Sequence, residues 1–179
     1  MKPELFEKRE EKQVLVFRSA GLELGVDISC VREVLRPQAI SPLPRMPTFI
    51  EGVINLRGRI VVLIDLAKRL DAGRTEEEAR KRVIICKVKT FVIGLVVNRL
   101  KEIIALPREQ IAPPPGMVSL QKGSEILSGI ARAGDRIIPL LDLDRLLTAK
   151  EADQLSVLND ERNVTVDCGR IQALQGPSR

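Results

Sequence analysis

The chain has 179 residues, a formal net charge of +5 and a hydrophobic fraction of 44%. This hydrophobic fraction is that of an ordinary globular protein and argues against disorder of the whole chain, while the length allows one domain or two small ones. The chain contains no histidine, which removes the usual general base at neutral pH and the commonest zinc ligand. The composition therefore favours a binding module over an enzyme, with no cofactor.

Neither a membrane span nor a signal peptide is predicted. The apolar run from Ile60 to Leu66 is seven residues long and includes Asp65, whereas about 20 residues are needed to cross a bilayer. The N-terminus is charged and lacks an apolar core, so we expect a cytoplasmic protein without direct membrane insertion. Nucleic-acid binding is the alternative that the positive charge suggests, but basic and acidic residues are interleaved and no Trp or Tyr is present to stack on bases.

A flexible charged arm is predicted at 1–12, followed by a first lobe at 13–73. Alternating residues predict strands at 13–18 and 23–26, whereas residues 31–35 fit either a helical face or an irregular strand. Four prolines within residues 37–47 predict an extended loop.

A hairpin is expected next, because two β-rich runs at 53–56 and 59–65 flank Arg57 and Gly58. Gly58 can adopt the positive φ of a tight turn, which places Arg57 near the tip. Asp65 is positioned to cap a short helix that ends near Leu70.

A linker at 74–82, with a capping-box pattern from Thr75 to Glu78, leads to a second lobe at 83–148. Strands are predicted at 82–88 and 90–97, and a second hairpin turns at Gly134-Asp135. Asp142 is expected to cap another short helix, and Lys150 to Leu158 reads as a surface helix within a C-terminal helix and tail at 149–179.

The two lobes repeat one pattern. Eight residues separate glycine from glutamate in both Gly25–Glu33 and Gly94–Glu102, and thirteen separate glycine from aspartate in both Gly52–Asp65 and Gly129–Asp142. Such a repeat predicts two similar lobes. Short strands bounded by glycine and proline turns at this spacing favour small closed barrels.

Differences between the two copies are the first candidates for function. Arg57 can bind a partner's carboxylate or carbonyls through its planar fork of donors, or it can bond carbonyls inside its own protein and fasten one lobe to the other. Asn55 can lock the same turn or extend the same surface. Glu33 and Glu102 occupy equivalent positions, which favours a common structural role.

Val96 and Val97 replace the Asp27-Ile28 of the first copy, either as core residues or as lining of a groove for a partner helix. The cysteines are odd in number, widely spaced and without a CxxC pair. Cys30 and Cys86 lie in apolar runs and are interpreted as small core residues.

Seven blocks of this sequence follow one another in a specific order: Val14–Phe17, Gly25–Ile28, Val31–Val34, Phe49–Gly58, Ile64–Leu66, Ile93–Val97 and Pro139–Leu143. In this order they resemble the CheW coupling proteins of bacterial chemosensory arrays. The Asn-Leu-Arg-Gly hairpin at 55–58 and the Asp-Leu pair that follows it are the most specific of these. The resemblance covers about residues 13–147.

The resemblance implies a fold, a function and a set of contact residues. The fold would be mainly β, with two intertwined five-stranded Src-homology-3-like barrels and short helices around a shared core. The function would be that of a non-catalytic adaptor, which couples chemoreceptor cytoplasmic tips to the regulatory domain of the histidine kinase CheA at membrane-associated arrays. The partner-contact positions carried over are Val31, Glu33, Gly52, Arg57 and Gly58, to which we add Val96 and Val97 as candidates for the groove between the lobes.

Overall fold

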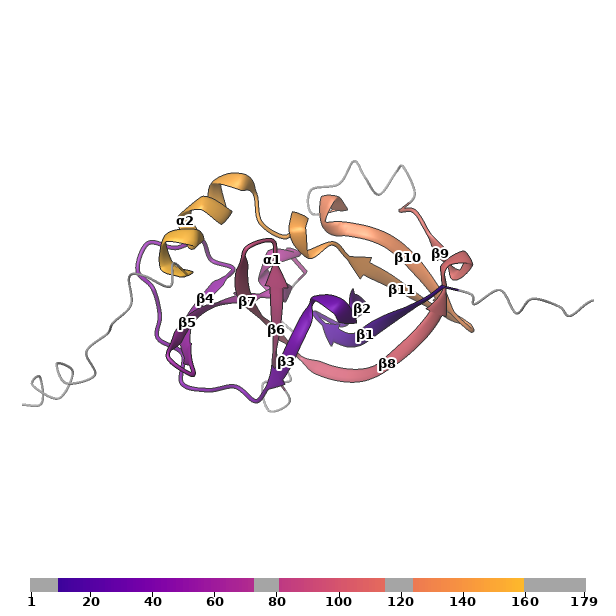
Figure 1. Ribbon diagram of the computed structural model, residues 1–179, viewed down its shortest axis with the longest axis horizontal. Coiled ribbons are helices and arrows are strands. Elements are labelled where there is room, and N and C mark those ends of the chain that lie inside the picture. Colours follow the sequence, from indigo (N-terminus) through magenta and orange to yellow (C-terminus); the bar gives the residue numbers. More distant parts are fainter. Residues whose placement is uncertain (1–9, 73–80, 115–123, 160–179) are drawn as a thin grey trace, which may run out of the picture.

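The computed structural model describes residues 10–72, 81–114 and 124–159, and over these residues the protein is mainly β (Figure 1). The strands are β1 (Glu11–Ser19), β2 (Leu22–Asp27), β3 (Val31–Leu35), β4 (Ile50–Leu56), β5 (Arg59–Asp65), β6 (Arg82–Val88), β7 (Phe91–Val97), β8 (Arg99–Pro107), β9 (Ile111–Ala112), β10 (Leu127–Ala133) and β11 (Arg136–Leu141). The α-helices are α1 (Leu66–Arg69) and α2 (Ala149–Asn159), and single 3-10 turns lie at Ile28–Cys30 (η1), Arg108–Gln110 (η3), Ser124–Ile126 (η5) and Leu143–Arg145 (η6).

The strands form two barrel-like sheets. The six-stranded barrel has the order β8-β1-β2-β11-β10-β9, and the five-stranded barrel has the order β3-β6-β7-β5-β4. Each barrel takes strands from both halves of the chain, so the predicted intertwining is confirmed. The sequence segments 13–73 and 83–148 therefore do not coincide with the barrels. The two-residue strand β9 is an addition to the five strands expected in each.

The two barrels have the same architecture. An edge strand, β8 or β3, comes first in each sheet. It is followed by a hairpin (β1-β2 or β6-β7) and then by a second hairpin (β11-β10 or β5-β4). In both, the parallel contact joins equivalent strands: β2 with β11, and β5 with β7. The sequence repeat thus reflects a structural repeat, related by an approximate two-fold axis.

The repeated glycines show how closely the barrels match. A Cβ on Gly25 would lie 2.6 Å from Val14 and 2.9 Å from Leu140, whereas a Cβ on Gly94 would lie 2.4 Å from Leu63 and 2.8 Å from Val83. Leu63 and Val83 are the repeat equivalents of Leu140 and Val14. Only glycine fits at these two positions without displacing the barrel interior.

Three hydrophobic clusters stabilise the described residues. One fills the six-stranded barrel and another fills the five-stranded barrel. The third and largest takes side chains from both sheets, so it lies between the barrels and fastens them together. We call this third cluster the inter-barrel core.

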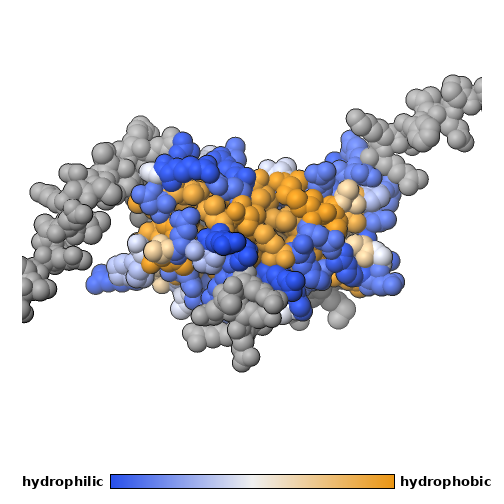
Figure 2. Space-filling model, turned by 90° about the horizontal axis from the view of Figure 1, so that it is seen from below, coloured by the Kyte–Doolittle hydropathy of each residue, from blue (hydrophilic) through white to orange (hydrophobic). Residues whose placement is uncertain are grey.

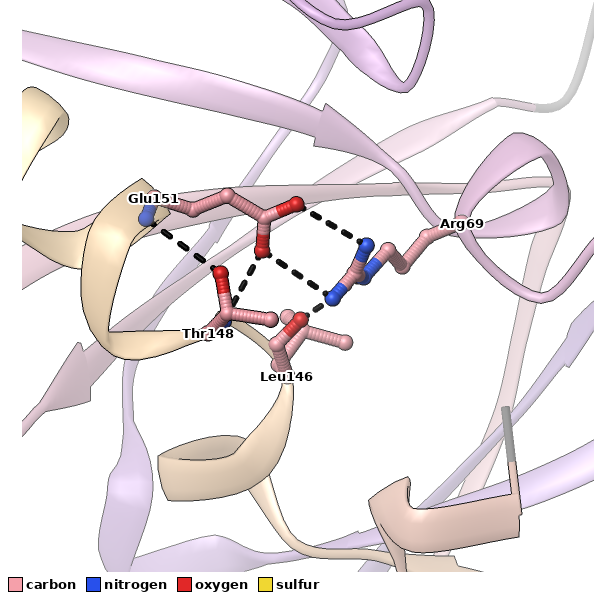
Figure 3. Close-up of polar contacts among 4 residues, drawn as sticks. All are labelled: Arg69, Leu146, Thr148 and Glu151. Atoms are coloured by element: carbon pink, nitrogen blue, oxygen red, sulfur yellow. Dashed lines mark hydrogen bonds and ion pairs between the residues drawn. The ribbon is translucent and has the colours of Figure 1, made fainter. Parts of the chain in front are cut away.

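Helix α2 packs on this inter-barrel core and is fastened by Arg69 (Figure 3). Leu155 is 2% exposed within the core. Arg69 donates from Nε to the carbonyl of Leu146 at 2.7 Å and from its two terminal nitrogens to Glu151 at 3.3 and 3.2 Å. Its guanidinium also lies 4.5 Å from the ring centroid of Phe49.

The start of α2 is a capping box. The backbone N–H of Glu151 donates to the Thr148 hydroxyl at 3.3 Å, and the Thr148 N–H donates to the Glu151 carboxylate at 2.8 Å (Figure 3). Glu151 therefore caps its own helix and also binds Arg69 of the other chain half. The helix predicted at 150–158 is confirmed, one residue longer at each end.

Most local predictions agree with the structure. The strands predicted at 13–18, 23–26, 82–88 and 90–97 are present, and the ambiguous segment 31–35 is strand β3. Asp65 accepts from the backbone N–H of Lys68 and caps α1, and Asp142 accepts from the N–H of Asp144 and caps the 3-10 turn η6. The arm predicted at 1–12 is too long, because residues 11 and 12 pair with β8 as the start of β1. Its residues 1–9, the capping-box pattern at 75–78, the tail at 160–179 and Cys168 lie outside the described residues.

Candidate functional site

The β4–β5 hairpin presents Arg57 at its tip. Arg57 and Gly58 have φ angles of 52° and 84°, and two positive values are typical of the tight two-residue turn that joins twisted strands. Asn55 accepts a hydrogen bond from the Gly58 N–H at 2.8 Å, so its side chain locks the turn. Arg57 consequently projects from a rigid support, with 78% of its side chain exposed.

Arg57 forms an ion pair with Glu33, at 3.0 Å between its terminal nitrogen and the carboxylate. Glu33 belongs to β3 and Arg57 to the β4–β5 hairpin, so the pair connects the two edges of the five-stranded sheet. Arg57 is thus bonded within its own barrel, to a carboxylate rather than to carbonyls, so this ion pair does not fasten one lobe to the other. Its exposure leaves the guanidinium accessible to a partner as well.

Glu102, the repeat equivalent of Glu33, makes the corresponding contact in the six-stranded barrel. It lies on edge strand β8 and accepts from Arg136 of the β10–β11 hairpin at 2.7 Å. The common structural role predicted for the two glutamates is therefore visible: each ties an edge strand to the hairpin that completes its barrel.

Between the two edge strands lies an exposed apolar surface. Val34 on β3 and Ile103 on β8 are 37% and 58% exposed, and they are repeat equivalents. Val31 and Leu100, also equivalent, are partly buried against the inter-barrel core. We call Val31, Val34, Leu100 and Ile103 the inter-barrel strip, because it continues that core to the surface.

Figure 2 views the molecule from the lower side of Figure 1, where β3 and β8 lie. It shows a continuous hydrophobic area across the middle of this face, with hydrophilic residues on both sides. Strand pairing gives the reason for the strip. Val34 lies opposite Ile84, and Ile103 lies opposite Leu15, both of which are inter-barrel core residues. Cross-strand partners share a face, so the strip points to the same side as the core.

The other candidate residues differ in accessibility. Gly52 is buried with φ +143°, and a Cβ at this position would lie only 2.4 Å from the Ser41 carbonyl, so Gly52 acts through backbone shape. Val96 and Val97 are 5% and 2% exposed. Val96 faces the interior of the five-stranded barrel and Val97 faces the inter-barrel core, since alternate residues of a strand face opposite sides. Their core interpretation agrees with the structure, and neither side chain lines an open surface.

The turn before β3 is held by Asp27. Its carboxylate accepts from the N–H and the hydroxyl of Ser29 at 2.9 and 2.6 Å and pairs with Lys12 at 3.2 Å. Burial acts to raise the pKa of Asp27, but the Ser29 and Lys12 hydrogen bonds outweigh it and the pKa is lowered. The carboxylate form is thereby favoured where β3 begins.

A second charged group surrounds Glu23 in the six-stranded barrel. Glu23 binds Lys101 at 2.8 Å and Arg136 at 2.9 Å. The hydrogen bond from Lys101 is the main reason that the pKa of Glu23 is lowered, and the hydrogen bond to Glu102 raises the pKa of Arg136. Arg136 is thus shared between two carboxylates.

The cysteines contribute packing. Cys86 is fully buried and Cys30 is half-buried against the inter-barrel core; both are free thiols. Burial raises the pKa of Cys86 to about 12. Over residues 10–72, 81–114 and 124–159, no cluster of three metal-ligating side chains occurs. Within the same described portion, no helix is long and apolar enough to span a membrane.

Two features of this region were not predicted from the sequence. The exposure of Val34 and Ile103 could not be predicted, because the local sequence does not show which apolar residue of an edge strand remains exposed. Their equivalent positions in the repeat were the one sequence feature that linked them. The Thr148–Glu151 capping box was readable from sequence as threonine followed three residues later by glutamate.

Comparison with known proteins agrees with this architecture. The CheW-like domain family matches residues 13–151. Protein FrzA of Myxococcus xanthus is 34% identical over 146 residues, covering 80% of this chain and 90% of that protein. The probable chemotaxis protein CheW of Rhizobium etli is 32% identical over 143 residues, covering 80% and 92% respectively. The crystal structure of scaffolding protein TtCheW from Thermoanaerobacter tengcongensis matches with a TM-score of 0.73 and 34% identity, covering 79% of this chain and 97% of that one. The chain therefore belongs to the CheW-like domain family.

Proposed function

We propose that this protein is a non-catalytic adaptor in a chemosensory array, where it couples the cytoplasmic tip of a chemoreceptor to the regulatory domain of the histidine kinase CheA. It would act in the cytoplasm and be recruited to arrays at the membrane. Family membership supports the adaptor role. The observation that carries the receptor-binding part is the inter-barrel strip, an apolar surface flanked by ion-paired edges.

The strip suits a helical partner. An amphipathic helix presents apolar side chains on one face, and such a face can cover Val34 and Ile103 and the partly buried residues beside them. Covering these side chains would extend the inter-barrel core rather than create a separate contact. Each interface can be modest, because repetition in a lattice raises the effective concentration of the binding sites.

The strip is tested with Ile103→Glu. We expect this variant to lose most co-sedimentation with a chemoreceptor cytoplasmic-tip fragment, because a carboxylate would have to be buried against the helix. Its melting temperature should change little, since the side chain is 58% exposed. Ile137→Glu is the matched control, because Ile137 is 66% exposed and its strand, β11, contributes no residue to the inter-barrel strip. Equal binding by both variants would refute the proposed surface.

Arg57→Glu tests the hairpin tip. It should weaken receptor or kinase association while leaving unfolding nearly unchanged, because an exposed ion pair contributes only about 0–1 kcal/mol. Pull-downs with the receptor fragment alone, the kinase regulatory domain alone and both together would show which partner the hairpin meets. A large drop in melting temperature with normal binding would instead assign Arg57 to fastening the barrel.

A further inference from the structure

We propose that unequal charges at the two ends of the inter-barrel strip fix the direction in which a helical partner lies on it. The acidic end of the helix would lie at the five-stranded barrel, and its basic or uncharged end at the six-stranded barrel. This inference rests on the proposed function and adds the partner's charge distribution and binding polarity.

Apolar contacts alone do not set a direction. The strip consists of two pairs of repeat equivalents, Val31 with Leu100 and Val34 with Ile103, on equivalent strands. Both strands lie on one face, so the approximate two-fold axis that relates them passes through that face between them. A helix turned by 180° about this axis would exchange the barrels that its two ends meet and would find similar apolar residues again.

The charged residues beside the strip break this equivalence. The tip of the β4–β5 hairpin is Arg57-Gly58, whereas the tip of the β10–β11 hairpin is Gly134-Asp135. The two tips therefore have opposite charge. Each hairpin is bonded to the edge strand of its own barrel, through Glu33 or Glu102, so the charge difference is held at the two ends of the strip.

Glu23 increases the difference. Its repeat equivalent in the five-stranded barrel is Val92, an uncharged residue. Counted over nine equivalent positions of the edge strands, the hairpins and the Glu23 position, the five-stranded side has four arginines and one glutamate, for a formal charge of +3. The six-stranded side has three arginines, one lysine, two glutamates and one aspartate, for a formal charge of +1. The positions are Cys30, Arg32, Glu33, Arg36, Asn55, Arg57, Gly58, Arg59 and Val92 on one side, and Arg99, Lys101, Glu102, Ala105, Arg132, Gly134, Asp135, Arg136 and Glu23 on the other.

Arg57 and Arg136 also differ in their ion-pair partners and in their exposure. Arg136 is held between Glu23 and Glu102, and 40% of its side chain is exposed. Arg57 pairs with Glu33 and is 78% exposed. A carboxylate on an approaching helix therefore meets an accessible guanidinium at the five-stranded barrel. At the other end it meets an arginine already shared by two acids, beside the negative Asp135.

Photo-crosslinking of the full chain to a chemoreceptor cytoplasmic-tip fragment tests the polarity. An apolar photoreactive residue is placed at Val34 or at Ile103, and the labelled half of the fragment is identified by mass spectrometry. We expect Val34 to label the more acidic half and Ile103 the other half. Exposed charges act weakly one by one, so a preference of about fivefold is expected rather than complete selection.

The double variant Arg57→Asn/Asp135→Arg is the deciding comparison. Asparagine before Gly58 suits the positive φ of the first turn, and Asp135 is exposed, so both changes should preserve the fold. We expect the double variant to bind the fragment with the labelling preference abolished or reversed. High salt should also weaken the preference of the unmodified chain, because exposed charges are screened.

Two results would overturn the inference while leaving the proposed function intact. One is equal labelling of both halves from each position, and the other is an unchanged labelling map in the double variant. Failure of the unmodified chain to bind or crosslink the fragment at all would refute the proposed function, and the inference with it.

Discussion

Arg69→Ala is predicted to loosen α2 and to destabilise the protein more than any exposed arginine would. The Arg69 and Glu151 side chains are only 17% and 21% exposed. Loss of the charged donor to the Leu146 carbonyl should cost about 1.5 kcal/mol. Loss of the ring contact with Phe49 adds about 0.5–1 kcal/mol, and loss of the Glu151 pair adds up to about 1 kcal/mol. The expected total is about 3 kcal/mol.

Urea and thermal unfolding measure this change. For a domain of this size, 3 kcal/mol corresponds to a fall in melting temperature of about 6–12 °C. Hydrogen exchange should localise the effect, with amides of α2 exchanging faster than those of β6, the strand between β3 and β7.

Two further variants separate charge from geometry. Arg69→Lys keeps the positive charge but not the planar fork, so it should recover only part of the lost stability. A double-mutant cycle with Glu151→Gln should give a coupling free energy of about 1 kcal/mol. A cost below about 1 kcal/mol for Arg69→Ala, or α2 amides that exchange at the unmodified rate, would show that Arg69 does not hold α2 in place.

Three other predictions concern the barrels and the core between them. Gly25→Ala and Gly94→Ala should each destabilise the protein by about 1–3 kcal/mol in urea unfolding, because the added Cβ would lie 2.6 or 2.4 Å from a core side chain. Unchanged urea midpoints would show that the side chains inside the barrels can move to accommodate the methyl group. Thiol labelling of the folded chain should modify Cys30 well before Cys86, which is fully buried and whose pKa is raised to about 12. Comparable labelling rates would contradict this. The pKa of Glu23 is lowered in the folded state, so its carboxylate stabilises the fold above the unfolded-state pKa, and that contribution disappears as the pH falls through the lowered value. Glu23→Gln should therefore flatten the acid side of the stability profile, and an unaltered profile would contradict the assignment.

Local features of the fold were predictable because their causes are local. A glycine at a tight turn, an aspartate before a short helix and alternating strand residues act over a few positions, so Gly58, Asp65 and β1 could be read directly. The repeat was readable as well, because equivalent positions meet equivalent packing needs. The prediction of two intertwined barrels came from the family resemblance.

Which strands pair is decided by contacts far apart in sequence, and no local pattern records them. The partition at 74–82 follows the repeat, yet β1 and β2 pair within the six-stranded barrel together with β8 and β11. The candidate surface shows the same limit. Val96 lies on β7, which has neighbours on both sides and is covered, whereas Val34 lies on β3, which has a neighbour on one side only. Two valines of similar local context thus differ in exposure because of strand order.

The inter-barrel core explains why this fold suits an adaptor. Two barrels packed side by side bury a shared apolar layer between them. The described strands of the barrels do not cover this layer on its upper and lower sides (Figure 1). On the upper side in Figure 1 the chain's own α2 lies against β5 and β7 of the five-stranded barrel and inserts Leu155 into this layer. On the lower side no helix of the described residues lies over β3 and β8, and Val34 and Ile103 remain exposed. The same apolar layer therefore receives a side chain of an internal helix on one side and is left available on the other. An external helix across β3 and β8 would bury the open side of this layer, just as the chain's own α2 buries Leu155 in the same layer against β5 and β7.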